Sequence, residues 1–153
     1  MNRLKKGAVA TAMAVLLVGG FEGLRLYSYQ DVIGVWTACY GETSGIHKGM
    51  RFTKTQCDQE LAESLASHEK GMRSCLKDPD GLPDKVYVAE LSLAYNIGVT
   101  AFCRSSIARK TNAGDLRGAC DAIPLYNRAG GRIIPGLVNR RTKERLFCLE
   151  GLH

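Results

Sequence analysis

The chain changes character at residues 22–43, which read EGLRLYSYQDVIGVWTACYGET. The first part, residues 22–30, is predicted to end a helix and to lead out of it. From Asp31 to Phe52 the sequence is rich in β-branched and aromatic residues, and glycines recur at positions 34, 41, 45 and 49. This pattern predicts a small antiparallel sheet with tight turns.

Helical patterns follow the predicted sheet. A helix is expected from Thr53 or Thr55 to about Arg73. A buried central helix is expected from Asp84 up to Gly98, because apolar residues occupy nearly every face of that segment. Further helices are predicted at 99–110, 115–123 and 138–149, with loops at 76–83 and 127–136. The predicted fold class is α+β, with a small antiparallel sheet followed by a helical bundle.

Length and composition limit the classes of function that the chain can have. The chain has 153 residues, which is enough for one domain but too short for a two-domain enzyme with a dinucleotide-binding half. Hydrophobic residues make up 45% and charged residues 24%, a mixture typical of globular proteins. The net charge of +6 favours a polyanionic partner such as a bacterial wall, an anionic membrane or nucleic acid. Basic residues are not interleaved with aromatic ones, so we expect no nucleic acid partner.

Six cysteines indicate the compartment. They are widely spaced along the chain, and the three histidines are scattered singly, so no zinc or redox motif is present and we expect no metal. The sequence also lacks a P-loop, GxGxxG, HExxH and GxSxG, and we expect no cofactor. An even number of separated cysteines favours disulfides and an oxidising compartment. The alternative is six reduced, buried thiols.

The N-terminus is typical of an export signal. Arg3, Lys5 and Lys6 precede an uncharged apolar run, residues 7–21, which is shorter than the ~20 residues that span a bilayer comfortably. The basic flank would stay in the cytoplasm and place the following chain outside. Two alternatives remain: a buried first helix of a cytoplasmic domain, and a signal peptide cleaved after Gly20.

Two carboxylates and a hydroxyl lie close together in the opening segment. Glu22 is flanked by apolar residues, which predicts an apolar setting that favours a protonated acid, whereas Asp31 is expected in a wetter turn where it stays charged. Glycoside cleavage needs two such carboxylates, and a threonine such as Thr37 can hold a water beside the second one. The alternative is an exposed glutamate and an aspartate that caps a turn.

The spacing E-x8-D-x5-T of these residues resembles the active-site signature of phage lysozymes of glycoside hydrolase family 24. Further similar words follow in order: FTKTQC (52–57), AYNIG (94–98), NAGD (112–115), GGRIIPGL (130–137) and NRRTKER (139–145). The resemblance covers about residues 22–150. It implies a lysozyme-like α+β fold and an endolysin that hydrolyses the β-1,4 bond between N-acetylmuramic acid and N-acetylglucosamine in peptidoglycan.

The resemblance also implies residue roles. Glu22 would be the general acid, Asp31 the base or electrostatic partner, and Thr37 the residue that positions water. Arg140 resembles a basic residue that faces the catalytic glutamate; the alternative for Arg140 and Arg141 is a solvated helix face. A glycan groove is expected to be lined on one side by Tyr40, Gly41 and Glu42, and on the other by residues 127–136, including Gly130 and Gly131.

Some members of this family resemble signal-arrest-release endolysins, and the apolar run fits that pattern. We expect residues 1–21 to act as a signal-anchor segment and residues 22–153 to form the muramidase domain. Transient inner-membrane association through residues 7–21 would be followed by release of a monomer into the host periplasm. Because position 31 is Asp rather than Cys, a disulfide switch at that position is not expected.

Structural disulfides are then expected for the six cysteines. Among fifteen connectivities, we predict Cys39–Cys57, Cys75–Cys103 and Cys120–Cys148. Two other functions remain open: a lytic transglycosylase, and a non-enzymatic cationic exported protein that binds the wall or the membrane. The pair Asp31 and Thr37 favours hydrolysis, because a transglycosylase has no use for a positioned water.

Overall fold

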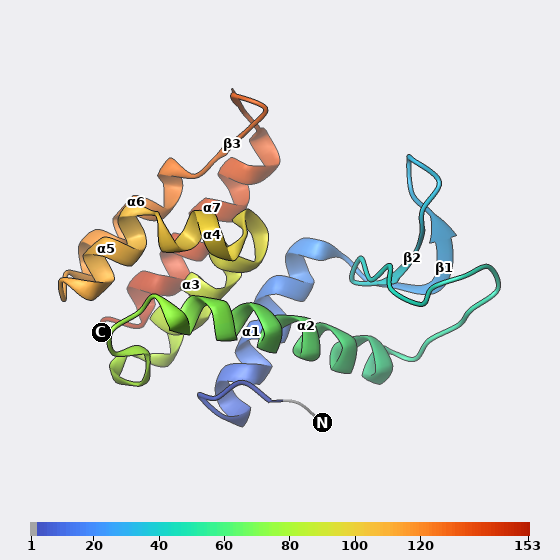
Figure 1. Cartoon of the computed structure of the whole chain (residues 1–153), viewed down its shortest axis with the longest axis horizontal. Coiled ribbons are helices and arrows are strands. Elements are labelled where there is room, and N and C mark those ends of the chain that lie inside the picture. Colours follow the sequence, from blue (N-terminus) through green and yellow to red (C-terminus); the bar gives the residue numbers. More distant parts are fainter. Residues whose placement is uncertain (1–2) are drawn as a thin grey trace. The chain divides into compact units, whose positions relative to one another are not determined.

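The computed structural model describes residues 3–153, and Figure 1 shows its helices and strands along the chain. The chain divides into two compact units, Met1–Ala66 and Ser67–His153, and the boundary falls within one helix, α2. The elements are α1 (Ala8–Glu22), β1 (Arg25–Gln30), β2 (Trp36–Cys39), α2 (Lys54–Ser74), η1 (Pro79–Gly81), α3 (Asp84–Ile97), α4 (Val99–Cys103), α5 (Ser106–Asn112), α6 (Leu116–Ala122), η2 (Ile123–Leu125), β3 (Arg128–Ala129), β4 (Arg132–Ile133) and α7 (Pro135–Glu150).

The sheet of the first unit is the hairpin β1–β2, whose strands are antiparallel. It begins earlier than predicted, because Arg25–Gln30 is a strand and not the exit of a helix. It also ends earlier than predicted, at Cys39 rather than Phe52. Residues 40–53 form turns, and only a single bridge between Tyr27 and Arg51 pairs this segment with β1. These pairings join residues distant in the chain, so local composition alone does not determine where the strands end.

Helix α1 is a packed element of the first unit. Ala10, Ala14 and Val18 recur every four residues on one face and are fully buried. On the same side, a Cβ added at Gly19 would lie 3.0 Å from the ring of Tyr40 and 3.5 Å from Leu61. The predicted boundary after residue 21 therefore falls inside α1. Among residues 3–153, no helix is long and apolar enough to cross a membrane.

Helix α2 begins with a reciprocal cap. The Thr53 hydroxyl accepts the Gln56 N–H (3.1 Å), and the Gln56 side-chain oxygen accepts the Thr53 N–H (2.8 Å). The adjacent first turn carries Cys57, which is bonded to Cys39 at the end of β2. The hairpin is thus fixed covalently to α2.

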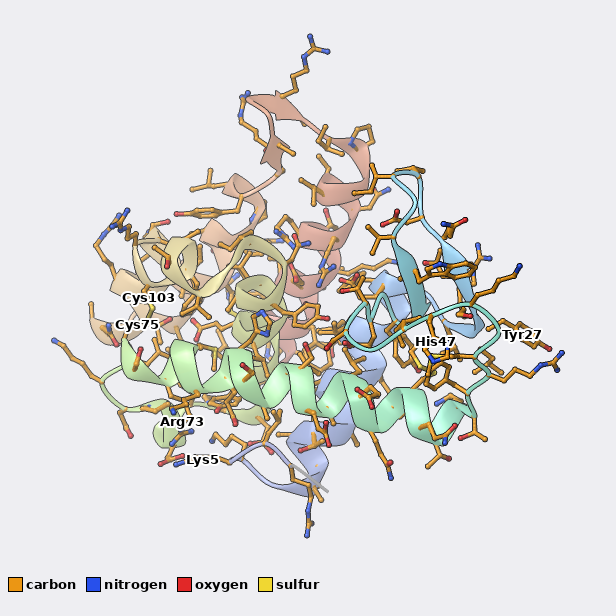
Figure 2. All side chains as sticks on the ribbon, turned by 45° about the vertical axis from the view of Figure 1, so that its right-hand side comes forward. Lys5, Tyr27, His47, Arg73, Cys75 and Cys103 are labelled. Carbon is orange, nitrogen blue, oxygen red and sulfur yellow. A yellow bond between two sulfur atoms is a disulfide. The ribbon has the colours of Figure 1, made fainter. Side chains whose placement is uncertain are left out.

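The second unit is a helical bundle around α3. The prediction of a buried central helix is confirmed, because every residue from 86 to 94 is buried. Helix α7 packs against α3, and α5 packs against α6. Disulfides Cys75–Cys103 and Cys120–Cys148 tie the bundle, and Figure 2 shows Cys75 beside Cys103. All three disulfides have the predicted pairing, and reduced thiols, the alternative, are not observed.

Candidate active site

Glu22 is the last residue of α1. The next residue, Gly23, has φ 77°, a backbone conformation that glycine adopts without strain, and its N–H donates to the carbonyl of Gly19 (3.0 Å). The side chain of Glu22 is exposed, so the apolar setting predicted from its neighbours is wrong. The reason is that the apolar face of α1 is turned toward the core through Val18 and Gly19, and Glu22 lies beyond it. Glu22 therefore lies where the helix dipole concentrates partial negative charge.

Asp31 shapes the tight turn between β1 and β2. Its Oδ1 accepts the N–H groups of Ile33 (3.0 Å) and Val35 (2.9 Å), and its own N–H donates to the carbonyl of Val35 (2.9 Å). Asp31 therefore caps the turn, as the alternative interpretation of this residue predicted. This cap leaves Oδ2 without a hydrogen bond to any residue in the described range 3–153. One oxygen orients the carboxylate, and the other is available for chemistry.

Thr37 lies in β2, directly opposite Tyr29 of β1. Side chains of opposite residues point to the same face of a hairpin, and so do residues two apart on one strand. Since Asp31 follows Tyr29 by two residues and pairs with Val35, Asp31 and Thr37 are diagonal neighbours, with roughly 7–8 Å expected between them. The Thr37 hydroxyl donates to the Val35 carbonyl (3.0 Å), which leaves its oxygen able to accept from water.

The structure therefore brings Asp31 and Thr37 to one face of the hairpin. Glu22 precedes this hairpin by the two-residue link Gly23–Leu24, and Arg25, the first residue of β1, pairs with Cys39, two residues after Thr37. A helix end, a tight turn and a strand of the first unit thus carry the three predicted catalytic residues. Within residues 3–153, no cluster of three or more His, Cys, Asp or Glu side chains is arranged to hold a metal ion.

Tyr40 occupies a packing position rather than a groove-lining one. Its side chain is buried, and its hydroxyl donates to Asp58 of α2 (2.5 Å). Burial and the adjacent Asp58 carboxylate raise the pKa of Tyr40 to about 12, so the phenol stays protonated. Because the side chain is buried, it gives no support to the prediction that Tyr40 contacts substrate.

Pockets are found among the described residues of the first unit, and two of them bear on the site. One of about 180 Å³ is lined by Glu42 and by residues near it in the turns after β2, with Cys39 and Glu60. The other, of about 770 Å³, lies between α1 and α2, and none of its lining residues belongs to the hairpin. The smaller pocket is therefore the one beside the hairpin. It contains Glu42 but neither Tyr40 nor Gly41, so the predicted groove wall stays a prediction.

Arg140 and Arg141 are buried in the second unit, so the alternative of a solvated helix face is wrong. Both pair with the buried Glu144: Arg141 Nε lies 2.5 Å from Oε1, and Arg140 Nε lies 3.5 Å from Oε2. Ser92 of α3 also donates to Glu144 (2.5 Å). Burial raises the pKa of Glu144, and the two guanidinium groups oppose that rise.

Glu144 was not predicted from the sequence as the partner of these arginines. Its spacing of three and four residues from them, on one helix, is the signal that could have indicated it. Arg141 additionally donates to the side chain of Asn96 (2.8 Å) and to the carbonyl of Tyr126 (3.2 Å). The network therefore ties α7 to α3 and to the segment just before the hairpin β3–β4.

Gly130 and Gly131 form the turn of the hairpin β3–β4. Their φ angles of 58° and 77° lie in the left-handed region, and both residues are exposed. Two successive residues of this kind match the turn that joins closely paired strands. Their glycine identity is thus explained by the turn, and their predicted contact with substrate stays a prediction.

Comparison with known proteins places this geometry in a family. The Phage lysozyme family model matches residues 19–144. A SAR-endolysin of Enterobacteria phage P21 is 38% identical over 151 residues, which cover 95% of this chain and 90% of the relative.

Two solved structures are similar along nearly the whole chain. The active form of the P1 phage endolysin Lyz has a TM-score of 0.80 and 28% identity, covering 97% of this chain and 87% of that one. The muramidase domain of SpmX from Asticaccaulis excentricus has a TM-score of 0.79 and 27% identity, covering 96% and 99%. The chain therefore belongs to the phage lysozyme family.

Proposed function

We propose that this chain is an endolysin that hydrolyses the β-1,4 bond between N-acetylmuramic acid and N-acetylglucosamine in bacterial peptidoglycan. The observation that carries the proposal is the common face of Asp31 and Thr37 on a hairpin that begins three residues after Glu22. The names of two similar proteins, a SAR-endolysin and a muramidase domain, support the same substrate and bond.

In the proposed mechanism, Glu22 donates a proton to the leaving glycosidic oxygen. The free Oδ2 of Asp31 accepts a proton from the attacking water or stabilises the cationic sugar. Thr37, whose hydroxyl hydrogen is already donated to Val35, accepts a hydrogen bond from that water. The turn holds the Asp31 carboxylate through two backbone N–H groups, so it needs little reorganisation during the reaction.

The first test is Glu22→Gln, compared with Glu63→Gln, an exposed glutamate of α2. Loss of a general acid should reduce the rate of glycan cleavage by about 10²- to 10⁴-fold, whereas Glu63→Gln should match the wild type. Purified peptidoglycan, muropeptide chromatography and thermal unfolding of each variant make the measurement. Cleavage by Glu22→Gln at the wild-type rate would contradict the proposal.

The products separate the two alternative functions. Hydrolysis leaves a reducing N-acetylmuramic acid end that has gained one water, whereas a lytic transglycosylase leaves an anhydro ring without added water. Mass spectrometry of the released muropeptides distinguishes them. A non-enzymatic cationic binder would release no muropeptides, and its binding would weaken with added salt but not with Glu22→Gln.

We further propose that α1 serves twice, first as a membrane anchor and then as part of the folded enzyme. The chain would be exported to the host periplasm with residues 7–21 in the inner membrane, and later released as a monomer. The dilution of the apolar run by glycine and alanine keeps its lipid-burial free energy small. While α1 is in lipid, Ala10, Ala14 and Val18 cannot pack in the first unit, and Glu22 is held at the membrane boundary, which would keep the tethered form inactive.

A further inference from the structure

An arginine stacked on a tyrosine lies on the hairpin that carries the proposed catalytic residues. The guanidinium carbon of Arg25 is 5.1 Å from the centre of the Tyr29 ring, which is a cation–π distance. Arg25 is exposed and Tyr29 is half-buried. In residues 3–153 the structure gives Arg25 no carboxylate partner and the Tyr29 hydroxyl no hydrogen bond. The ring holds the cation in place, and its donors face solvent.

The strand register and the ring stacking place this pair on the catalytic face. Tyr29 is directly opposite Thr37, and Arg25 is directly opposite Cys39, two residues further along β2. Tyr29 therefore points to the same face as Thr37 and Asp31. The register shifts between Arg25 and Tyr29, so strand pairing alone does not set the side of Arg25, and the stacking of its guanidinium on the Tyr29 ring places it at that face. The pair therefore lies beside the position proposed for the scissile bond.

A guanidinium held flat in this way is suited to a carboxylate. Its planar fork of N–H donors matches two carboxylate oxygens, and prior stacking on a ring reduces the rotamer freedom lost on binding. The proposed substrate supplies such a group beside the cleaved bond. The muramic acid residue carries a lactyl substituent that ends either in a free carboxylate or in an acidic peptide.

We propose that Arg25, held on Tyr29, binds a carboxylate of the muramic acid substituent and selects muramyl glycans over uncharged ones. The inference rests on the proposed function and adds a specificity-determining residue to it. Arg25 takes no part in proton transfer, so its removal should act on substrate binding, and therefore on KM, more than on kcat.

A second stacked pair on the same strand provides a matched control. The guanidinium of Arg51 is 4.9 Å from the centre of the Tyr27 ring, and Tyr27 is 60% exposed, at the outer margin of the unit in Figure 2. Arg51 belongs to a segment that pairs with the edge of β1 opposite β2, through Ser28 N–H to the Met50 carbonyl (3.0 Å). Arg51 is thus one strand further from Thr37 than Arg25 is. Arg51→Gln and Arg25→Gln change the net charge by the same amount.

The experiment compares Arg25→Gln, Arg25→Lys and Arg51→Gln on three purified glycan preparations. These are strands with stem peptides, strands stripped of peptides by an amidase, and stripped strands whose lactyl carboxylates are converted to amides. For Arg25→Gln we expect KM on carboxylate-bearing strands to rise roughly 10- to 100-fold with little change in kcat. Arg25→Lys should recover part of the loss, and Arg51→Gln should stay within twofold of the wild type.

The amidated strands give the decisive comparison. The wild type should bind them as weakly as Arg25→Gln does, and Arg25→Gln should be insensitive to amidation. If Arg25→Gln has a raised KM on stripped strands, the bound group is the lactyl carboxylate. If its KM is raised only on peptide-bearing strands, the bound group is a carboxylate of the peptide. For each variant, the KM on amidated strands is divided by the KM of the same variant on stripped strands. Partial unfolding of a variant therefore does not affect this ratio.

Equal KM changes for Arg25→Gln and Arg51→Gln, or an equal loss on amidated strands, would overturn the inference while leaving the proposed function intact. Failure of the proposed function has a different signature. In that case the wild type cleaves none of the carboxylate-bearing strands, or Glu22→Gln cleaves them as the wild type does.

Discussion

Glu90 is a carboxyl group that the proposed chemistry does not use, and it is fully buried in α3. It accepts a hydrogen bond from Thr111, and its Oε2 has no partner. Burial raises the pKa of Glu90 to about 8, against 4.5 for an unperturbed glutamate, and the Thr111 hydrogen bond opposes the rise. The folded chain therefore holds a proton here that the unfolded chain releases above pH 4.5.

This proton links folding to pH. Between about pH 4.5 and 8 the unfolded state binds fewer protons than the folded state, so stability falls as pH rises, by up to about 1.4 kcal/mol per pH unit. The contribution is fully present below pH 4.5 and is lost as pH passes the folded pKa. Glu90→Gln should remove this slope and raise the unfolding temperature at pH 8.

Thermal unfolding from pH 5 to 8 makes the measurement, with the exposed Glu63→Gln as the control that keeps the slope. A slope in Glu90→Gln equal to that of the wild type would show that Glu90 is not its source.

A motif spacing in the sequence predicts three catalytic residues, whose roles stay predictions, but it does not predict which glutamates packing buries. Glu22, Asp31 and Thr37 follow from one spaced signature, and the helix end and hairpin place them in one unit. The burial of Glu90 and Glu144 could not be read in the same way. A glutamate in a helix is normally exposed, and only contacts with other helices, through Thr111 and Ser92, put these two inside.

At the element scale, the close contact of α1 with the rest of the first unit depends on one small residue. A Cβ at Gly19 would be 3.0 Å from a Tyr40 ring atom, whereas a Cβ at Gly20 would meet nothing within 4 Å. Gly19→Val should therefore destabilise the fold by about 1–3 kcal/mol through overpacking. Gly20→Val has the same chemistry in open space, and it should leave stability nearly unchanged.

Urea unfolding of the purified variants measures this difference. The two glycines are neighbours in one helix, so helix propensity affects both variants alike, and only packing separates them. Equal midpoints for Gly19→Val and Gly20→Val would show that α1 does not pack against Tyr40 in solution.

The elements that local patterns specify were predicted closely, and those that depend on distant partners were not. The central helix and the cap of α2 at Thr53 follow from periodicity and from a reciprocal cap. By contrast, Arg25–Gln30 becomes a strand through partners at Trp36–Cys39 and residues 50–52. Helix α7 begins at Pro135 rather than Val138, because proline fits the first helical position.

For the molecule as a whole, the proposed export role and the observed fold make opposite demands on residues 7–21. A signal peptide can be removed after export, but α1 contributes buried Ala10, Ala14 and Val18 to the first unit and covers the ring of Tyr40. Cleavage after Gly20 would remove these contacts and leave Glu22 without its helix. The requirements of packing therefore favour retention of the segment in the active enzyme.

Intact-mass measurement of the soluble, active protein tests this retention. We expect the mass of the full chain less six hydrogens, because three disulfides each remove two, and reduction should restore them. Loss of the initiator methionine alone would keep α1 and agree with the prediction. An active species beginning near Phe21 would contradict it, since the hairpin would then be folded and functional without the helix that positions Glu22.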